Sequence, residues 1–232
     1  MARLMSPALA LCILFPIPSP SAEPTRVAPI YSLPEDGSWV EYDWTGVGPD
    51  GKEVKGRLRV SSVGSKTSGG VESRWVEVRK EYAQGGETKR EYRKFLVAAK
   101  AFAAAPTLRD HVGTVIGQDG SAAPLLFSAA RARDFLNMGF DAPDAALKEV
   151  WARARLTTPL GKYEARQVTA RSKSGERVRE YEGWLTADVP FGCARFEVRE
   201  GEGDGSSKTV FTATAVRRGK GAKSEVNEAK TK

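Results

Sequence analysis

Apolar and polar residues alternate one by one over several long stretches of this chain, and this pattern constrains the fold more than any other feature. In the first stretch, Val40, Tyr42 and Trp44 fall on one face of an extended segment, with charged or polar residues between them. Three similar stretches follow, separated by glycine-rich turn sequences, at residues 54–62, 71–82 and 88–97. Alternating segments joined by short turns predict an antiparallel meander that is apolar on one face.

The alternation returns in the second half of the chain after an interruption. Five further segments carry it, at residues 148–156, 163–171, 176–186, 193–199 and 208–217. The sequence therefore predicts a mainly β protein with one domain over residues 37–216. We expect a single curved antiparallel sheet, a half-barrel of about nine to ten strands.

Residues 98–147 interrupt the strand pattern and predict a helical and looped insertion. An alanine-rich segment at 98–105 predicts one or two helical turns that end before Pro106, and residues 110–118 predict a strand. Residues 125–140 keep bulky apolar side chains without alternation, and a helix is expected over residues 127–136. We expect residues 125–140 to cover the concave face of the sheet. The apolar residues expected on that face are Tyr42, Trp44, Leu58, Val60, Val76, Val78, Tyr92 and Leu96.

Residues 1–22 have the layout of a secretory signal peptide, with Arg3, then an apolar run, then small residues up to Ala22. The run is too short to span a bilayer of about 30 Å. Cleavage is expected after Ser21 or Ala22, which predicts a periplasmic or secreted protein with an irregular, proline-rich lead-in over residues 23–36. The residue before Cys12 is not small, so lipid attachment is not expected. No later segment predicts a transmembrane helix.

The formal charge of +7 is concentrated at the C-terminal end. Residues 217–232 hold six basic and two acidic side chains, and Val226 is their single large apolar residue. This composition predicts a basic, disordered tail. Such a tail could meet an envelope protein or an anionic surface. Nucleic acid is not an expected partner of an exported chain.

Three short motifs in the second half carry a resemblance to a known family. They are TPLGKYEA at residues 158–165, Trp184-Leu185, and DVPFG at residues 188–192. In strand layout over residues 39–216, the chain resembles uncharacterised bacterial secreted proteins with an antiparallel half-barrel similar to the lipoprotein carrier (LolA-like) fold. The resemblance implies a fold and transfers no catalytic residue. Pro190 and Gly192 would also suit a corner between strands.

Several kinds of chemistry are disfavoured by counting. His111 is the only histidine, so a site built on several histidines is excluded. Cys193 is the one cysteine outside the leader, which predicts a small buried side chain and no internal disulfide. The many carboxylates alternate with basic residues along strands, as expected of cross-strand pairs on a solvated face. We therefore predict no catalytic residue, no metal site and no cofactor.

The remaining candidate is the shape of the sheet. We expect an exported, non-catalytic binding protein that holds an apolar ligand, such as a lipid or an acyl chain, in its half-barrel. The residues expected to contact this ligand are Tyr42, Trp44, Tyr92, Phe135, Met138 and Phe140. Two alternatives stay open: an envelope interaction or scaffold module with no small ligand, and a hydrolase that uses Asp and Glu.

Overall fold

A computed structural model describes residues 30–48, 50–104, 112–127, 146–147, 152–202 and 207–226. Its elements, in chain order, are β1 (Trp39–Val47), β2 (Glu53–Ser68), β3 (Val71–Gln84), β4 (Glu87–Ala98), α1 (Ala99–Ala104), β5 (Val112–Asp119), β6 (Leu125–Phe127), β7 (Ala146–Leu147), β8 (Ala152–Thr158), β9 (Gly161–Ser174), β10 (Arg177–Leu185), the 3₁₀ turn η1 (Pro190–Gly192), β11 (Cys193–Glu202) and β12 (Ser207–Gly219).

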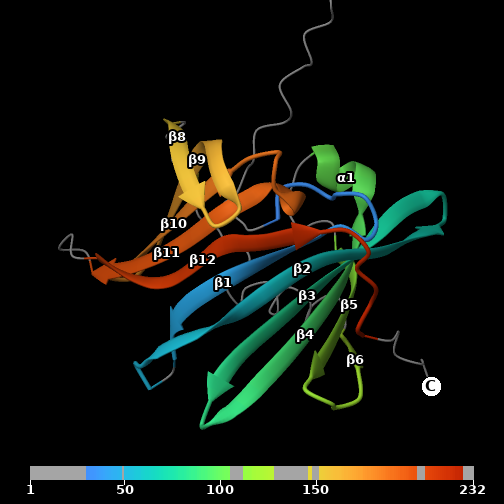
Figure 1. Ribbon diagram of the computed structural model, residues 1–232, viewed down its shortest axis with the longest axis horizontal. Coiled ribbons are helices and arrows are strands. Elements are labelled where there is room, and N and C mark those ends of the chain that lie inside the picture. Colours follow the sequence, from blue (N-terminus) through green and yellow to red (C-terminus); the bar gives the residue numbers. More distant parts are fainter. Residues whose placement is uncertain are drawn as a thin grey trace, which may run out of the picture.

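All of these strands belong to one antiparallel sheet (Figure 1). The strand order is β6-β5-β4-β3-β2-β1-β12-β11-β10-β9-β7, and β8 pairs with β9 beside β7. The strands β1 and β12 pair with each other in the middle of the sheet and join its two halves. The sheet does not close on itself, so the expected open, mainly β architecture is confirmed. The sheet has 12 strands, more than the sequence pattern predicted, because β6 and β7 have only three and two residues.

The strand register divides side chains between two faces of the sheet. We call the face that carries Tyr42 the inner face, and the opposite one the outer face. Directly paired residues share a face, so the pairs Tyr42–Leu58, Val60–Val78 and Val76–Phe95 all lie on the inner face. The alternation in β1, β2 and β3 therefore predicted the inner face correctly.

The prediction of which β4 side chains lie on the inner face was wrong. Tyr92 and Leu96 pair with Arg79 and Trp75, which places them on the outer face, and Phe95 and Val97 are the buried residues of the inner face. Residues 95–97 are a continuous apolar run, so alternation does not decide which face they belong to. Other parts of the protein pack against both faces of this strand. Its odd-numbered and its even-numbered positions therefore both carry apolar residues.

The main core lies against the inner face and is sealed by segments outside the sheet. Phe102 of α1, Ile30 of the lead-in and Phe191 of η1 are almost completely buried in it. The Phe191 carbonyl accepts hydrogen bonds from the backbone N–H groups of Tyr31 and Ser32, at 2.8 and 3.2 Å. Phe191 also has a φ of 66°, which is costly for a bulky residue and is held here by these contacts. The motif at residues 188–192 thus joins the lead-in to the core.

The insertion matches the expectations in part. Helix α1 confirms the expected helical turns, and β5 confirms the expected strand. Phe127, expected to begin a helix, instead ends the short strand β6. The rest of the helix expected over residues 127–136 lies outside the described residues, as do Phe135, Met138 and Phe140. In the described part of the chain, no helix is long and apolar enough to cross a membrane.

The C-terminal segment differs from the expected disordered tail. Strand β12 runs to Gly219, and the following residues stay on the sheet as far as Val226. The indole N–H of Trp39 donates to the Lys220 carbonyl at 3.3 Å, and the Ala222 N–H donates to the Gly37 carbonyl at 2.9 Å. Val226 is fully buried beside Trp75 and Ile116. A basic composition does not reveal this contact, because the contact depends on one apolar residue and on the distant residues that surround it.

Candidate ligand-binding site on the inner face

Three aromatic side chains from distant strands meet on the inner face. Trp44 of β1 packs edge-on against Tyr82 of β3, with ring centroids 6.0 Å apart, and stacks on Phe211 of β12 at 5.8 Å. Phe211 also makes an edge contact with Phe196 of β11. Aromatic groups of this size bury large areas and often form the apolar part of a ligand site.

Gly56 of β2 makes room for the Trp44 indole. A Cβ atom at this position would lie 2.9 Å from Trp44 Nε1 and 1.9 Å from the backbone oxygen of Glu81. Trp44 is 5% exposed, and its Nε1–H has no hydrogen-bond partner among the described residues. A buried donor without an acceptor costs about 1–3 kcal/mol, so the packing around the ring holds Trp44 in place at the expense of one hydrogen bond.

Lys80 of β3 lies over this aromatic group. Its Nζ atom is 4.4 Å from the centroid of the Trp44 ring and 5.1 Å from that of Tyr82, a cation–π arrangement. Burial of the ammonium lowers the pKa of Lys80, against the opposing effect of Glu91. Among the described residues, none forms a hydrogen bond or an ion pair with the Lys80 ammonium. We call Trp44, Tyr82, Phe211 and Lys80 the Lys80 cluster.

The nearest acidic side chains are engaged by other groups. Glu91 of β4 is directly opposite Lys80, but its carboxylate accepts a hydrogen bond of 2.6 Å from the Tyr82 hydroxyl and forms an ion pair of 4.0 Å with Arg93. Arg93 in turn bonds to Asp119 of β5 at 2.9 Å. The hydrogen bond to Glu91, together with burial, raises the pKa of Tyr82 to about 12. Lys80 is therefore a half-buried cation beside carboxylates that already have partners.

Three of the six residues predicted to contact a ligand are described by the structure, and of these three only Trp44 belongs to this cluster. Tyr42 lies on the same face, but it is fully buried and its hydroxyl donates to the Cys193 carbonyl at 2.9 Å. Tyr92 is on the outer face. Lys80 and Tyr82 were missed, although their parity with Val78 places them on the inner face and could have indicated them.

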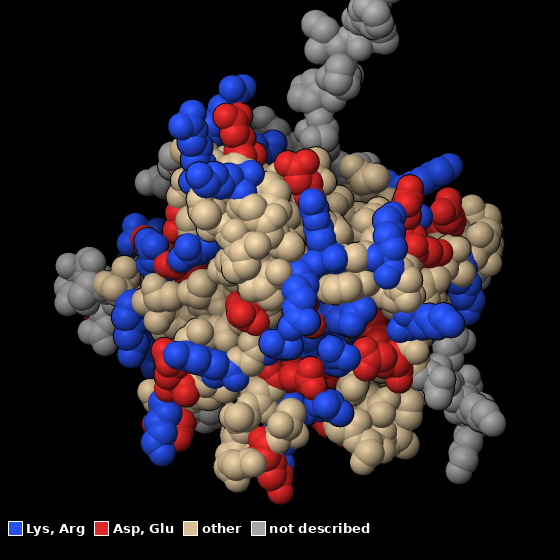
Figure 2. Space-filling view, in the orientation of Figure 1, with Lys and Arg blue, Asp and Glu red and all other residues tan. Residues whose placement is uncertain are grey.

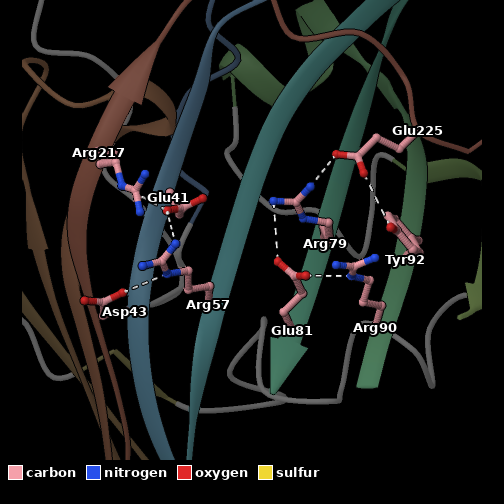
Figure 3. A network of polar contacts seen from close by, with 9 residues as sticks. All are labelled: Glu41, Asp43, Arg57, Arg79, Glu81, Arg90, Tyr92, Arg217 and Glu225. Atoms are coloured by element: carbon pink, nitrogen blue, oxygen red, sulfur yellow. Dashed lines mark hydrogen bonds and ion pairs between the residues drawn. The ribbon is translucent and has the colours of Figure 1, made fainter. Parts of the chain in front are cut away.

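The outer face presents charges that pair with one another. Glu41 forms ion pairs with Arg57 and Arg217, and Arg57 also contacts Asp43 (Figure 3). A second group centred on Arg79 is drawn in the same figure. It consists of Arg79, Glu81, Arg90, Tyr92 and Glu225. Figure 2 shows basic and acidic groups intermixed on the side of the molecule turned toward the viewer. This mixture fits a solvated surface better than a site for one charged ligand.

A pair of opposite charges on the outer face is almost fully buried. Glu77 of β3 and Lys94 of β4 are 3% and 4% exposed, and they pair across the two strands. Glu77 accepts hydrogen bonds from the Ser224 hydroxyl at 2.7 Å and from the Glu225 and Val226 N–H groups at 3.0 and 3.3 Å. Lys94 donates to the Ser224 hydroxyl and to the Val226 carbonyl at 2.9 and 3.2 Å. The C-terminal segment therefore satisfies both charges, which assigns them a structural role.

The other candidate reactive groups are outside this cluster. Burial raises the pKa of the Cys193 thiol to about 12, which keeps it protonated at neutral pH. His111 lies outside the described residues. Among the residues with described positions, no three His, Cys, Asp or Glu side chains are grouped closely enough to hold a metal ion.

The fold defines an open antiparallel half-barrel with a largely apolar inner face. Two solved structures are similar to this chain. One is a protein with a YmcC-like fold from Bacteroides fragilis that is described as exported, with 10% identity, a TM-score of 0.41, and coverage of 84% of this chain and 100% of the other. The second is a protein from Parabacteroides distasonis described as a lipoprotein, with 12% identity, a TM-score of 0.37, and coverage of 82% and 98%. No family model matches the chain. No curated protein matches it.

Proposed function

We propose that this protein is an exported, non-catalytic binding protein that holds an apolar ligand, a lipid or an acyl chain, against the inner face of its half-barrel. The Lys80 cluster is the observation that supports this most strongly. It brings Trp44, Tyr82 and Phe211 together from three strands on the inner face. A second apolar group on the same face is exposed: Leu125 of β6 pairs with Gly117 and is 62% exposed.

An interaction module without a small ligand is the second candidate. It is favoured by the dense packing elsewhere on the inner face, where Ile30, Phe102 and Phe191 are at most 1% exposed. In that function the aromatic residues would only complete a core. The two candidates differ in whether the protein binds a free lipid.

The neighbouring leucines of β6 provide a matched pair of variants for this test. Leu125 is on the inner face, whereas Leu126 pairs with Ile116 on the outer face and is 53% exposed. Both side chains are largely exposed, so replacing either by serine should change folding stability little. Leu125→Ser should weaken binding to an acyl chain that lies on the inner face, and Leu126→Ser should not.

The experiment is native mass spectrometry of the purified protein, followed by titration with hexadecanol. A co-purified lipid, or hexadecanol binding that is weakened by Leu125→Ser alone, supports the proposal. Absence of both bound lipid and hexadecanol binding would favour the interaction module. An equal loss for the two serine variants would place the ligand elsewhere.

A further inference from the structure

We infer that the apolar ligand carries an anionic head, a carboxylate or a phosphate, and that the Lys80 ammonium binds it over the Trp44 ring. This inference rests on the proposed function, because it names the chemical class of the ligand at the same site. It adds that the ligand must carry a negative charge, which binding to an apolar surface alone would not require.

The position of Lys80 is the first argument. Strand β3 places this residue on the inner face, in line with Val76 and Val78, where the neighbouring strands contribute Leu58 and Trp44. A lysine on an apolar face normally extends its ammonium into water or pairs it with a carboxylate. Here the ammonium lies 4.4 Å from the centre of an indole ring.

The neighbours of Lys80 supply the second argument. Glu91 is opposite it on β4, but that carboxylate is held by the Tyr82 hydroxyl and by Arg93, and Arg93 is held by Asp119. Among the described residues, the Lys80 ammonium therefore contacts the faces of two aromatic rings, and no oxygen acceptor lies within hydrogen-bond distance of it. A partly desolvated cation in this setting gains most from an anion that arrives with the ligand.

The surroundings of the ammonium define the rest of the ligand. Trp44 is 5% exposed, whereas the rings of Tyr82 and Phe211 are only partly buried, so part of their apolar surface remains accessible to a ligand. A small, fully hydrated anion would lose solvation here without filling this surface. An acyl chain would contact the rings while its head contacts Lys80, so the site fits an amphiphile better than a free anion.

The test compares ligands that share a chain but differ in their head. Palmitate, hexadecyl phosphate and hexadecanol are titrated into the purified protein by calorimetry, and acetate and inorganic phosphate serve as heads without a chain. We expect both amphiphilic anions to bind about tenfold more tightly than hexadecanol, the size expected of one charge-assisted hydrogen bond, and the free anions to bind far more weakly. A preference for one anionic amphiphile would identify the head as carboxylate or phosphate.

Two variants assign this preference to Lys80. Lys80→Met keeps an unbranched chain over Trp44 but removes the charge, so it should bind palmitate and hexadecanol equally, while Lys80→Arg should keep the preference. Lys89 is the matched control, because it faces the same side opposite Tyr82 but pairs with Glu87 at 2.6 Å. Lys89→Met should bind as the unchanged protein does.

A measurement on the unchanged protein adds a readout that does not compare affinities between variants. Reductive ¹³C-methylation of the lysines gives one NMR signal per side chain, and the Lys80 signal is the one missing from the Lys80→Arg spectrum. Palmitate should raise the pKa of this amine, and hexadecanol should not. Equal affinity for palmitate and hexadecanol, or a preference that survives in Lys80→Met, would overturn the inference and leave the apolar site intact. Failure to bind any of the chain-bearing probes would overturn the proposed function as well.

Discussion

Glu77 and Lys94 lie directly opposite each other on β3 and β4, and residues 224–226 donate or accept the hydrogen bonds that satisfy both. Their charges would be costly to bury without these partners. The segment after the last strand is therefore part of the folded structure, and its removal provides the first prediction.

Deleting residues 224–232 should destabilise the protein by on the order of 3 kcal/mol, because it removes the hydrogen bonds that residues 224–226 make with the charged groups of Glu77 and Lys94. It also removes the buried side chain of Val226. Urea denaturation measures the loss. Deleting only residues 227–232 is the control and should have little effect. Equal stability of the two truncated proteins would contradict the assigned role of residues 224–226.

Gly56→Ala should be destabilising by about 3 kcal/mol, near the upper end for an overpacked site. The new Cβ would lie 1.9 Å from the Glu81 backbone oxygen, which cannot move without disturbing the β2–β3 pairing. Thermal and urea unfolding would show the effect. Gly113→Ala in β5 is the matched control, because its nearest neighbour would be 4.0 Å away. A fully stable Gly56→Ala variant would mean that Trp44 and β3 can shift apart.

Phe102→Ala should cost about 3–5 kcal/mol, the range for truncating a buried aromatic residue. Phe102 is 1% exposed and is the residue by which the short helix α1 enters the main core. Lys100→Ala, an exposed change in the same helix, should leave stability within about 0.5 kcal/mol. A small loss for Phe102→Ala would indicate that α1 is only loosely attached to the sheet.

Stability should fall as the pH rises from about 9 to about 12, in part because of Cys193. Burial raises the pKa of this thiol from 9.0 to about 12, so between these values the unfolded chain loses the proton and the folded chain keeps it. Cys193→Ala should make the decline less steep when urea denaturation is repeated at each pH. An unchanged slope in the variant would show that other groups, such as Tyr42, account for the decline.

The sequence predicted the open antiparallel sheet because the first three strands alternate clearly, as Val76 and Val78 do against Glu77. It did not predict which β4 side chains lie on the inner face, because a continuous apolar run in this strand contributes to both faces. It also did not predict the contact of Val226 with Trp75, because the residues that surround this valine come from strands more than 100 positions away. A buried position formed by residues far apart in the sequence leaves no local sequence pattern.

Of the four described residues of the Lys80 cluster, only Trp44 was predicted from the sequence as a ligand contact. Alternation shows which side of a strand a residue faces, and on that basis Lys80 and Tyr82 could have been included. It does not show that the carboxylate opposite Lys80 is engaged by Tyr82 and Arg93. That arrangement requires three strands in register, and it is what distinguishes the lysine from the many paired cations of the outer face.

The pairing of β1 with β12 has a consequence for how the chain reaches its structure. Within the group β1 to β6, and within the group β8 to β12, most strands pair with their neighbours along the chain, which is fast. The pairing of β1 with β12 joins the two groups, and its residues are some 170 positions apart in the sequence. During synthesis the long hydrogen-bonding edge of β1 must therefore stay unpaired until β12 has been made. An unpaired edge of that kind can add a strand from another chain. For this protein, the interval before β12 arrives is the period of greatest exposure to misassembly.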